Sequence, residues 1–275
     1  MKRLNLFFAI SLMFFAFNSC QKDGVVTATD ETTLSLQETQ SEEALTDIDL
    51  LADEAVDSNI SQLKSADIVN NMYLSDCPVV TFNTTASPEV LTIDFGTSCT
   101  GKDGKIRSGK IIITSESFKT FPSVRDKSFD NYIVDGKKIT GSIVKTILKD
   151  NVNNIRTAQI TENVTINFPD NEGSSTRVSN ITRQYQRGAL GIRNDNQVVS
   201  WGTVEFTRLS GVKMNKTITA ENPLVFMADC HHIVSGIVSI TTSNNRSWTI
   251  DYGNGDCDNL ATLTIGGKAK IIKIR

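Results

Sequence analysis

The chain has 275 residues, 39% of them hydrophobic, and a formal net charge of −3. The charge is unevenly spread, because residues 21–67 carry 12 Asp/Glu against two Lys, whereas residues 68–275 carry 24 Lys/Arg against 19 Asp/Glu. So weak a basic excess argues against a nucleic-acid-binding domain. Residues 68–275 are long enough to bury one hydrophobic core.

Residues 1–19 have the organisation of a signal peptide. Two basic residues precede an apolar run over residues 6–17, and Ser19 stands directly before Cys20. The run is too short to span a bilayer as a stable helix. The tetrapeptide FNSC resembles the lipobox of bacterial lipoproteins, in which the signal is cut before the cysteine and its thiol carries a diacylglycerol.

This resemblance implies lipidation at Cys20 and stable membrane anchoring through several acyl chains, palmitate among them. The following residues, QKDG, are similar to the surface-export signal of Bacteroidetes-type lipoproteins. No second apolar run has the length of a membrane span. We therefore expect an outer-membrane, lipid-anchored protein on the periplasmic or cell-surface face, with the membrane as its partner.

The segment after Cys20 is polar, and then acidic. Residues 20–40 are rich in Thr and Gln without an apolar period, which predicts a flexible tether. Residues 41–67 place apolar side chains three and four positions apart, and Ser41 is a suitable N-cap, so this segment predicts an acidic helix. We interpret it as a solvated spacer; docking on the body and a stalk are the alternatives.

From about residue 76 the sequence alternates in short runs rich in Thr, Val, Ile and aromatic residues. Asp135-Gly136 between two such runs predicts a hairpin. Residues 68–275 thus predict an all-β antiparallel meander, either a twisted open sheet or a partly closed barrel, with a β-sandwich as the alternative. Residues 175–188 (STRVSNITRQYQRG) carry polar side chains on both sides of the predicted strand, so we expect an edge strand or one solvated on both faces.

Related units stand at the two ends of this β-domain, at residues 76–114 and 229–274. Each begins with Asp-Cys, continues to a Thr-Ile-Asp-aromatic-Gly strand end before a second cysteine, and closes on a Lys-Ile-Ile or similar run. In each unit the two cysteines flank a predicted hairpin turn symmetrically, which brings them near disulfide spacing. We therefore predict disulfides Cys77–Cys99 and Cys230–Cys257, which an exported location permits.

The stretch DCHHIV contains both histidines of the chain, His231 and His232, beside Cys230. Thiolate and imidazole are usual zinc ligands. Adjacent strand residues point to opposite faces, however, and Cys230 already has a predicted disulfide partner. We predict no metal and no cofactor, with His232 as the candidate ligand if a metal is bound.

Two aspartates and one loop are the other candidates for chemistry. Asp94 and Asp251 occupy equivalent places in the two units and could act as the acid and base of a glycosidase. Strand alternation puts Leu91, Ile93 and Phe95 on one face of the first strand, and Trp248, Ile250 and Tyr252 on the matching face of the second, and we predict that these two apolar sets belong to the core. We therefore interpret the two aspartates, on the opposite faces, as outward-facing turn residues. Asp103 and Gly104 resemble part of a calcium loop but lack the EF-hand spacing, which favours a hairpin turn.

Aromatic side chains offer another interpretation. Trp201, Trp248, Tyr132 and Tyr185 would stack on sugars if they were exposed, but core packing is the simpler expectation. The chain has no nucleophile elbow and no phosphate-binding glycine loop. No catalytic residue is therefore predicted, and the binding residues stay unknown.

Taken together, the lipobox, the acidic spacer and the Cys…IDFG…Cys element resemble uncharacterised secreted lipoproteins of the Bacteroidetes type. The resemblance implies location and fold class, not an activity. We expect a non-enzymatic envelope or surface protein with a binding or structural role, whose partner is an envelope glycan or protein. A lipid or lipoprotein carrier is the alternative, and a glycan-active hydrolase is the third hypothesis.

Overall fold

The computed structural model describes residues 28–62, 76–148, 155–170, 172–186, 196–208, 211–230 and 232–274. The predicted signal peptide and Cys20 lie outside these residues. One helix, α1 (Ala28–Gln62), precedes fifteen strands. The strands are β1 (Val79–Asn83), β2 (Glu89–Asp94), β3 (Cys99–Thr100), β4 (Ile106–Ser115), β5 (Ser123–Val134), β6 (Lys137–Ile147), β7 (Ile155–Asn167), β8 (Ser174–Gln186), β9 (Gln197–Arg208), β10 (Lys213–Ile218), β11 (Leu224–Met227), β12 (Ile233–Thr242), β13 (Ser247–Asn254), β14 (Leu260–Ile265) and β15 (Lys268–Lys273).

The strands form one antiparallel meander. Neighbours in the sheet follow chain order from β1 to β15, except that short β3 pairs with β4, and β10 and β11 both lie between β9 and β12. The predicted all-β antiparallel meander is thus confirmed as an open sheet. The described strands form one sheet whose end strands β1 and β15 do not pair, so the sheet is neither a closed barrel nor a two-sheet sandwich.

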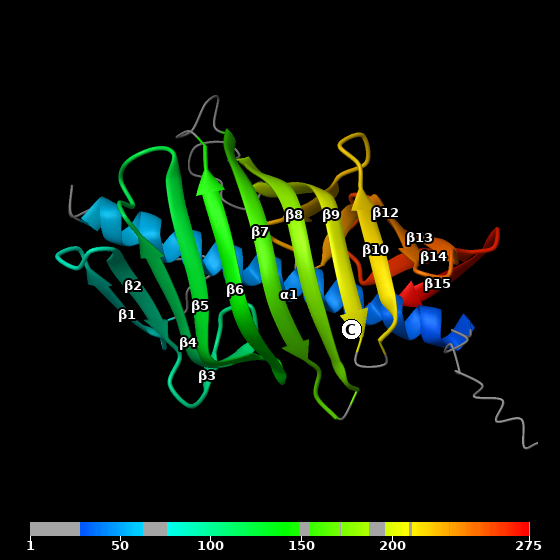
Figure 1. Ribbon diagram of the computed structural model, residues 1–275, viewed down its shortest axis with the longest axis horizontal. Coiled ribbons are helices and arrows are strands. Elements are labelled where there is room, and N and C mark those ends of the chain that lie inside the picture. The colour runs from blue at the N-terminus through cyan, green and yellow to red at the C-terminus, as the bar shows by residue number, and fades with distance from the viewer. Residues whose placement is uncertain are drawn as a thin grey trace, which may run out of the picture.

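Helix α1 runs across the whole sheet on one face (Figure 1). It contacts β14 towards one end and β2 towards the other. Two expectations are therefore wrong. The helix begins at Ala28 rather than at Ser41, so most of the predicted tether over residues 20–40 is helical. The helix also packs on the sheet and is not a solvated spacer. Nearly every described side chain of residues 31–60 is buried or half-buried.

The core lies between α1 and the face of the sheet that contacts it, which we call the inner face. Strand alternation sends every second side chain there. Leu91 and Ile93 of β2 and Trp248 and Ile250 of β13 are at most 3% exposed. These are the apolar sets that the two sequence units predicted, so their assignment to the core is confirmed.

Strand β8 corrects another expectation. It pairs along its full length with β7 and with β9, so it is neither an edge strand nor solvated on both faces. Its inward positions carry Arg177, Ser179 and Arg183, all of which are buried. A strand that is polar on both sides occurs here at the centre of the sheet because the element packed on its inner face is itself charged.

Local backbone signals place the turns and the close contacts between strands. The predicted hairpin at Asp135-Gly136 joins β5 to β6, and both residues have positive φ, as a two-residue turn of this type requires. Gly202 in β9 has φ 143°, and a Cβ built there would lie 2.2 Å from the carbonyl oxygen of Asn180 on β8. Only glycine permits that approach between strands. Among the described residues, no helix has the length and apolarity needed to cross a membrane.

Candidate functional site

The most unusual feature of the molecule is the charge on the surfaces that α1 and the sheet bury against each other. One face of α1 carries polar residues at three- and four-residue steps, which align on a helix: Glu31, Ser35, Glu38, Glu42, Thr46, Asp49, Asp53 and Asp57. The inner face of the sheet supplies buried cations from six strands: Arg107 (β4), Arg125 and Lys127 (β5), Lys145 (β6), Arg156 (β7), Arg177 and Arg183 (β8), and Lys216 (β10).

Asp49 is at the centre of one group of contacts. Its carboxylate accepts from Lys127 Nζ at 2.7 Å, from Lys145 Nζ at 3.0 Å and from a guanidinium nitrogen of Arg183 at 3.0 Å. One turn later Asp53 accepts from Lys145 at 2.6 Å and from Arg125 at 3.0 Å. Two carboxylates of α1 thereby bind cations of β5, β6 and β8.

Arg177 is at the centre of a second group. Its side chain is 1% exposed and donates to Glu162 of β7 at 2.8 Å, to Glu42 at 2.5 Å and, in a short contact, to Glu38. Lys216 donates to the same two helix carboxylates, at 2.6 Å to Glu42 and 2.7 Å to Glu38. The carboxylates therefore do not depend on a single cation.

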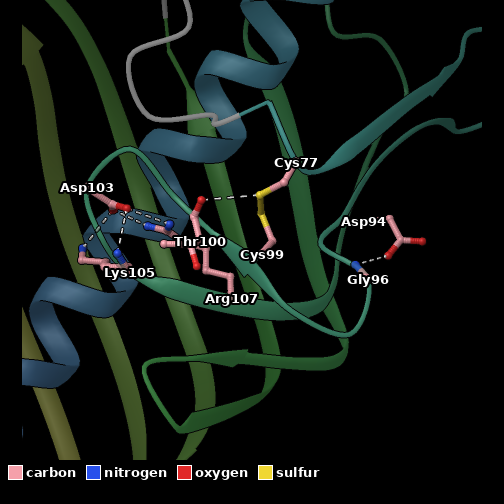
Figure 2. The surroundings of a disulfide bond; sticks show 8 residues. All are labelled: Cys77, Asp94, Gly96, Cys99, Thr100, Asp103, Lys105 and Arg107. Atoms are coloured by element: carbon pink, nitrogen blue, oxygen red, sulfur yellow. Dashed lines mark hydrogen bonds and ion pairs between the residues drawn. A yellow bond between two sulfur atoms is a disulfide. The ribbon is translucent and has the colours of Figure 1, made fainter.

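A third group lies near the β3–β4 turn. Arg107, which is 1% exposed, donates to Asp47 of α1 at 2.7 Å and to Asp103 of the turn at 2.6 Å. Lys105 Nζ lies 3.1 Å from the Asp47 carboxylate. Figure 2 shows Asp103, Lys105 and Arg107 together beside the helix. The three groups together fix α1 over the stretch from Glu38 to Asp53.

Electrostatics hold these carboxylates in the charged form. Burial alone would raise the pKa of Glu42, but the charges of Lys216 and Arg177 hold this pKa well below its usual range. Burial likewise opposes the ionisation of Asp49, and the charges of Lys127 and its neighbours keep the pKa of Asp49 well below normal. Glu42 and Asp49 are therefore ionised at neutral pH.

Buried ion pairs contribute little net stability, because desolvating the charges offsets most of their attraction. They penalise mispairing far more strongly, since an unpaired buried charge costs several kcal/mol. The charged contact between α1 and the inner face therefore fixes the rotation and the position of the helix.

Both predicted disulfides are present. Cys77 and Cys99 have Cα atoms 5.8 Å apart and Cys230 and Cys257 have Cα atoms 5.6 Å apart. Figure 2 shows Cys77 lying just before β1 and bonded to Cys99 on β3, beyond the hairpin that the two cysteines flank. Disulfides of this kind persist in oxidising environments, which indicates an extracytoplasmic location.

The disulfide removes Cys230 from any metal site. His231 lies outside the described residues, and His232 Nδ1 lies 3.2 Å from a carboxylate oxygen of Glu43 on α1. The hydrogen bond that His232 donates to the Glu43 carboxylate raises the pKa of His232 above its ordinary value. No local pattern in the sequence predicts this pairing between residues so distant in the chain.

Asp94 and Asp251 are not brought together. They lie on β2 and β13, near opposite ends of the sheet, and each accepts from the backbone N–H two residues later, Gly96 and Gly253, at 2.9 Å. Figure 2 shows the first of these turns. The interpretation as turn residues is confirmed for both. Asp103 also caps a hairpin turn, because it accepts from Lys105 N at 3.1 Å and joins no described calcium-like cluster.

The four candidate aromatic residues belong to the core. Tyr132 and Trp248 are 0% and 3% exposed, and the Trp248 indole donates to Ser35 of α1 at 3.0 Å. Tyr185 and Trp201 are half-buried and pack against the same core. None of the four is an exposed platform for a sugar ring.

The other side of the sheet, which we call the outer face, carries a row of small polar side chains. Cross-strand pairing aligns one residue from each of seven strands, β7, β8, β9, β10, β12, β13 and β14: Thr161, Asn180, Thr203, Thr217, Ser239, Thr249 and Thr264. Each is exposed or half-buried. Because neighbouring strands lie about 4.8 Å apart, the row repeats hydrogen-bonding groups at that spacing. We call these seven residues the outer row.

No protein-family model, curated protein or solved structure matches the chain. The residues themselves must therefore carry any functional argument. Two signals for the charged interface were present in the sequence: acidic residues at positions 38, 42, 49 and 53 share one helix face, and basic residues occupy the inward positions of strands such as Arg125-x-Lys127. Their complementarity becomes visible only when the sheet places those strands side by side.

Proposed function

We propose that this protein is an exported, lipid-anchored, non-enzymatic component of the cell envelope that binds envelope glycan through its outer face. The observation that carries the proposal is the occupation of the inner face by α1 through buried ion pairs. Because that face is filled, the outer face is the broad surface of the sheet left for a partner. Its outer row presents hydroxyl and amide groups, which can both donate to and accept from the hydroxyls of a polysaccharide.

The same observation weighs against a lipid carrier. A carrier would need an apolar concave face, whereas residues such as Lys127 and Arg177 lie buried under the helix. A hydrolase using Asp94 and Asp251 would need the two carboxylates close together, and they lie near opposite ends of the sheet. A binding or structural role requires neither arrangement.

The proposed lipid anchor lies a short distance along the chain from α1. If Cys20 carries the lipid, seven residues separate it from Ala28, where α1 begins. At about 3.5 Å per residue these span at most roughly 25–30 Å. The helix, locked to the sheet by its ion pairs, would then hold the β-domain close to the membrane.

Binding of the mature, disulfide-bonded chain to an array of bacterial envelope polysaccharides tests the proposal. The variant with Thr203→Val and Thr217→Val removes two adjacent hydroxyls of the outer row and keeps side-chain shape, so retention of polysaccharide should fall several-fold. Thr92→Val on β2 is the matched control and should bind normally. Equal binding by all three proteins, or by none, would contradict a glycan-binding outer row.

A further inference from the structure

A cavity of about 310 Å³ lies beside α1, away from the outer row. It is lined by three segments of the sheet domain and one of the helix: the β3–β4 turn with Lys105, the β5–β6 turn with Asp135 and Lys137, the β11–β12 connection with His232, and α1 with Gln40 and Glu43. Its volume falls at the lower end of the range for small-molecule sites. A monosaccharide-sized ligand is therefore the appropriate scale.

Most charged groups at the cavity are already paired. Lys105 Nζ lies 3.1 Å from Asp47, and His232 lies 3.2 Å from Glu43. The Asp135 carboxylate accepts from the backbone N–H of Ile106 at 2.9 Å. The Asp103 carboxylate binds Arg107, as Figure 2 shows from the side of the β3–β4 turn.

Lys137 is the exception. Its side chain is half-buried and, within the described part of the chain, makes neither a hydrogen bond nor an ion pair. Burial lowers the pKa of Lys137, and the charge of Asp135 acts on it only at longer range. A partly desolvated ammonium group that faces a cavity and makes no direct ion pair among the described residues can accept one negative charge.

The other lining groups define the rest of the ligand. The carboxylates of Glu43 and Asp135 each have more acceptor sites than their present partners use, and the Gln40 amide can donate and accept. These groups suit hydroxyls. Lys105 and Lys137 face the same space as these carboxylates, so a bare divalent cation bound here would lie beside two like charges.

We propose that this cavity binds a small hydroxylated carboxylate, such as an acidic monosaccharide, whose carboxylate pairs with Lys137 and whose hydroxyls donate to Glu43 and Asp135. The proposal does not depend on glycan binding at the outer row. It assigns a second, smaller site at the edge of the helix–sheet interface.

Calorimetric titration of the full mature chain with glucuronate at pH 7 tests the site. Glucose serves as the uncharged counterpart, and inorganic phosphate and calcium chloride test other ions. We expect glucuronate to bind and to raise the melting temperature, whereas glucose should bind at least about tenfold more weakly because it lacks the charge that pairs with Lys137.

Lys137→Gln should weaken glucuronate binding by about tenfold or more, since an ion-paired hydrogen bond is lost. Lys138→Gln is the matched control, because its exposed side chain lies on the opposite side of β6 and it should bind as the wild type does. Absence of glucuronate binding, or equal binding by the Lys137 variant, would overturn the proposal. Binding of phosphate or calcium without glucuronate would also overturn it, by showing a simple ion site.

Discussion

Replacing Arg177 with methionine tests the charged interface most directly. The substitution keeps an unbranched side chain of similar reach but removes the cation shared by Glu38, Glu42 and Glu162. Lys216 still serves the two helix carboxylates. Glu162, which is 2% exposed, keeps only the hydrogen bond from Ser179 Oγ at 2.7 Å among its described contacts.

Breaking a buried ion pair from one side costs about 3–5 kcal/mol, because the remaining charge stays desolvated. We therefore expect Arg177→Met to lower the free energy of unfolding by about that amount, measured by urea denaturation with the disulfides intact. Lys213→Met, at a pair whose side chains are 62% and 52% exposed, should change it by less than about 0.5 kcal/mol.

A second substitution separates the mechanism from simple loss of packing. The double variant Arg177→Met with Glu162→Met removes the stranded carboxylate as well. It should be more stable than Arg177→Met alone, because no uncompensated charge remains on β7. If Arg177→Met costs under about 1 kcal/mol, or if the double variant is the less stable of the two, this account of the interface is wrong.

Three other predictions concern the helix, a disulfide and the sheet. Because the folded-state pKa of Glu42 lies below its unfolded value, its ionised form adds stability at neutral pH that is lost as pH falls below about 5; urea midpoints that stay flat down to pH 3 would contradict this. Replacing Cys230 and Cys257 by serine opens a link of sequence separation 27 and should lower the free energy of unfolding by about 3.5 kcal/mol in the chain-entropy model, with unchanged stability as the contrary result. Gly202→Ala should cost at least about 2 kcal/mol because its Cβ meets the β8 backbone, whereas Gly211→Ala, with open space around it, should cost less; equal costs would remove the argument from close approach.

The sheet was predictable because its signals are local. Alternation placed Leu91 and Ile93 inside, the Asp135-Gly136 pair marked a hairpin, and the repeated cysteine spacing gave both disulfides. Each of these features depends on residues within a few tens of positions of each other. Strand order followed from the same locality, since a meander pairs each strand with its chain neighbours.

The helix was misjudged because its partner is distant in sequence. An acidic segment with a modest apolar stripe is normally solvated, and a strand such as β8 with Arg177 and Arg183 normally lies at an edge. Each segment considered alone violates the usual pattern of burial. The helix and the strand satisfy the usual pattern of burial only when they pack against each other. No local feature of either segment indicates that the other will cover it.

The same complementarity explains why the helix depends on the sheet. Residues 28–62 contain no Lys or Arg, and like charges stand four apart at Glu38 and Glu42, at Asp49 and Asp53, and again one turn later. Such pairs destabilise an isolated helix, each by about 0.2–0.5 kcal/mol. The cations of the inner face outweigh that repulsion once the helix is docked, so helix formation and docking are coupled. Helix α1 is the described segment nearest the proposed anchor at Cys20. If that anchor is present, the ion pairs that hold α1 against the sheet also set the position of the β-domain relative to the membrane.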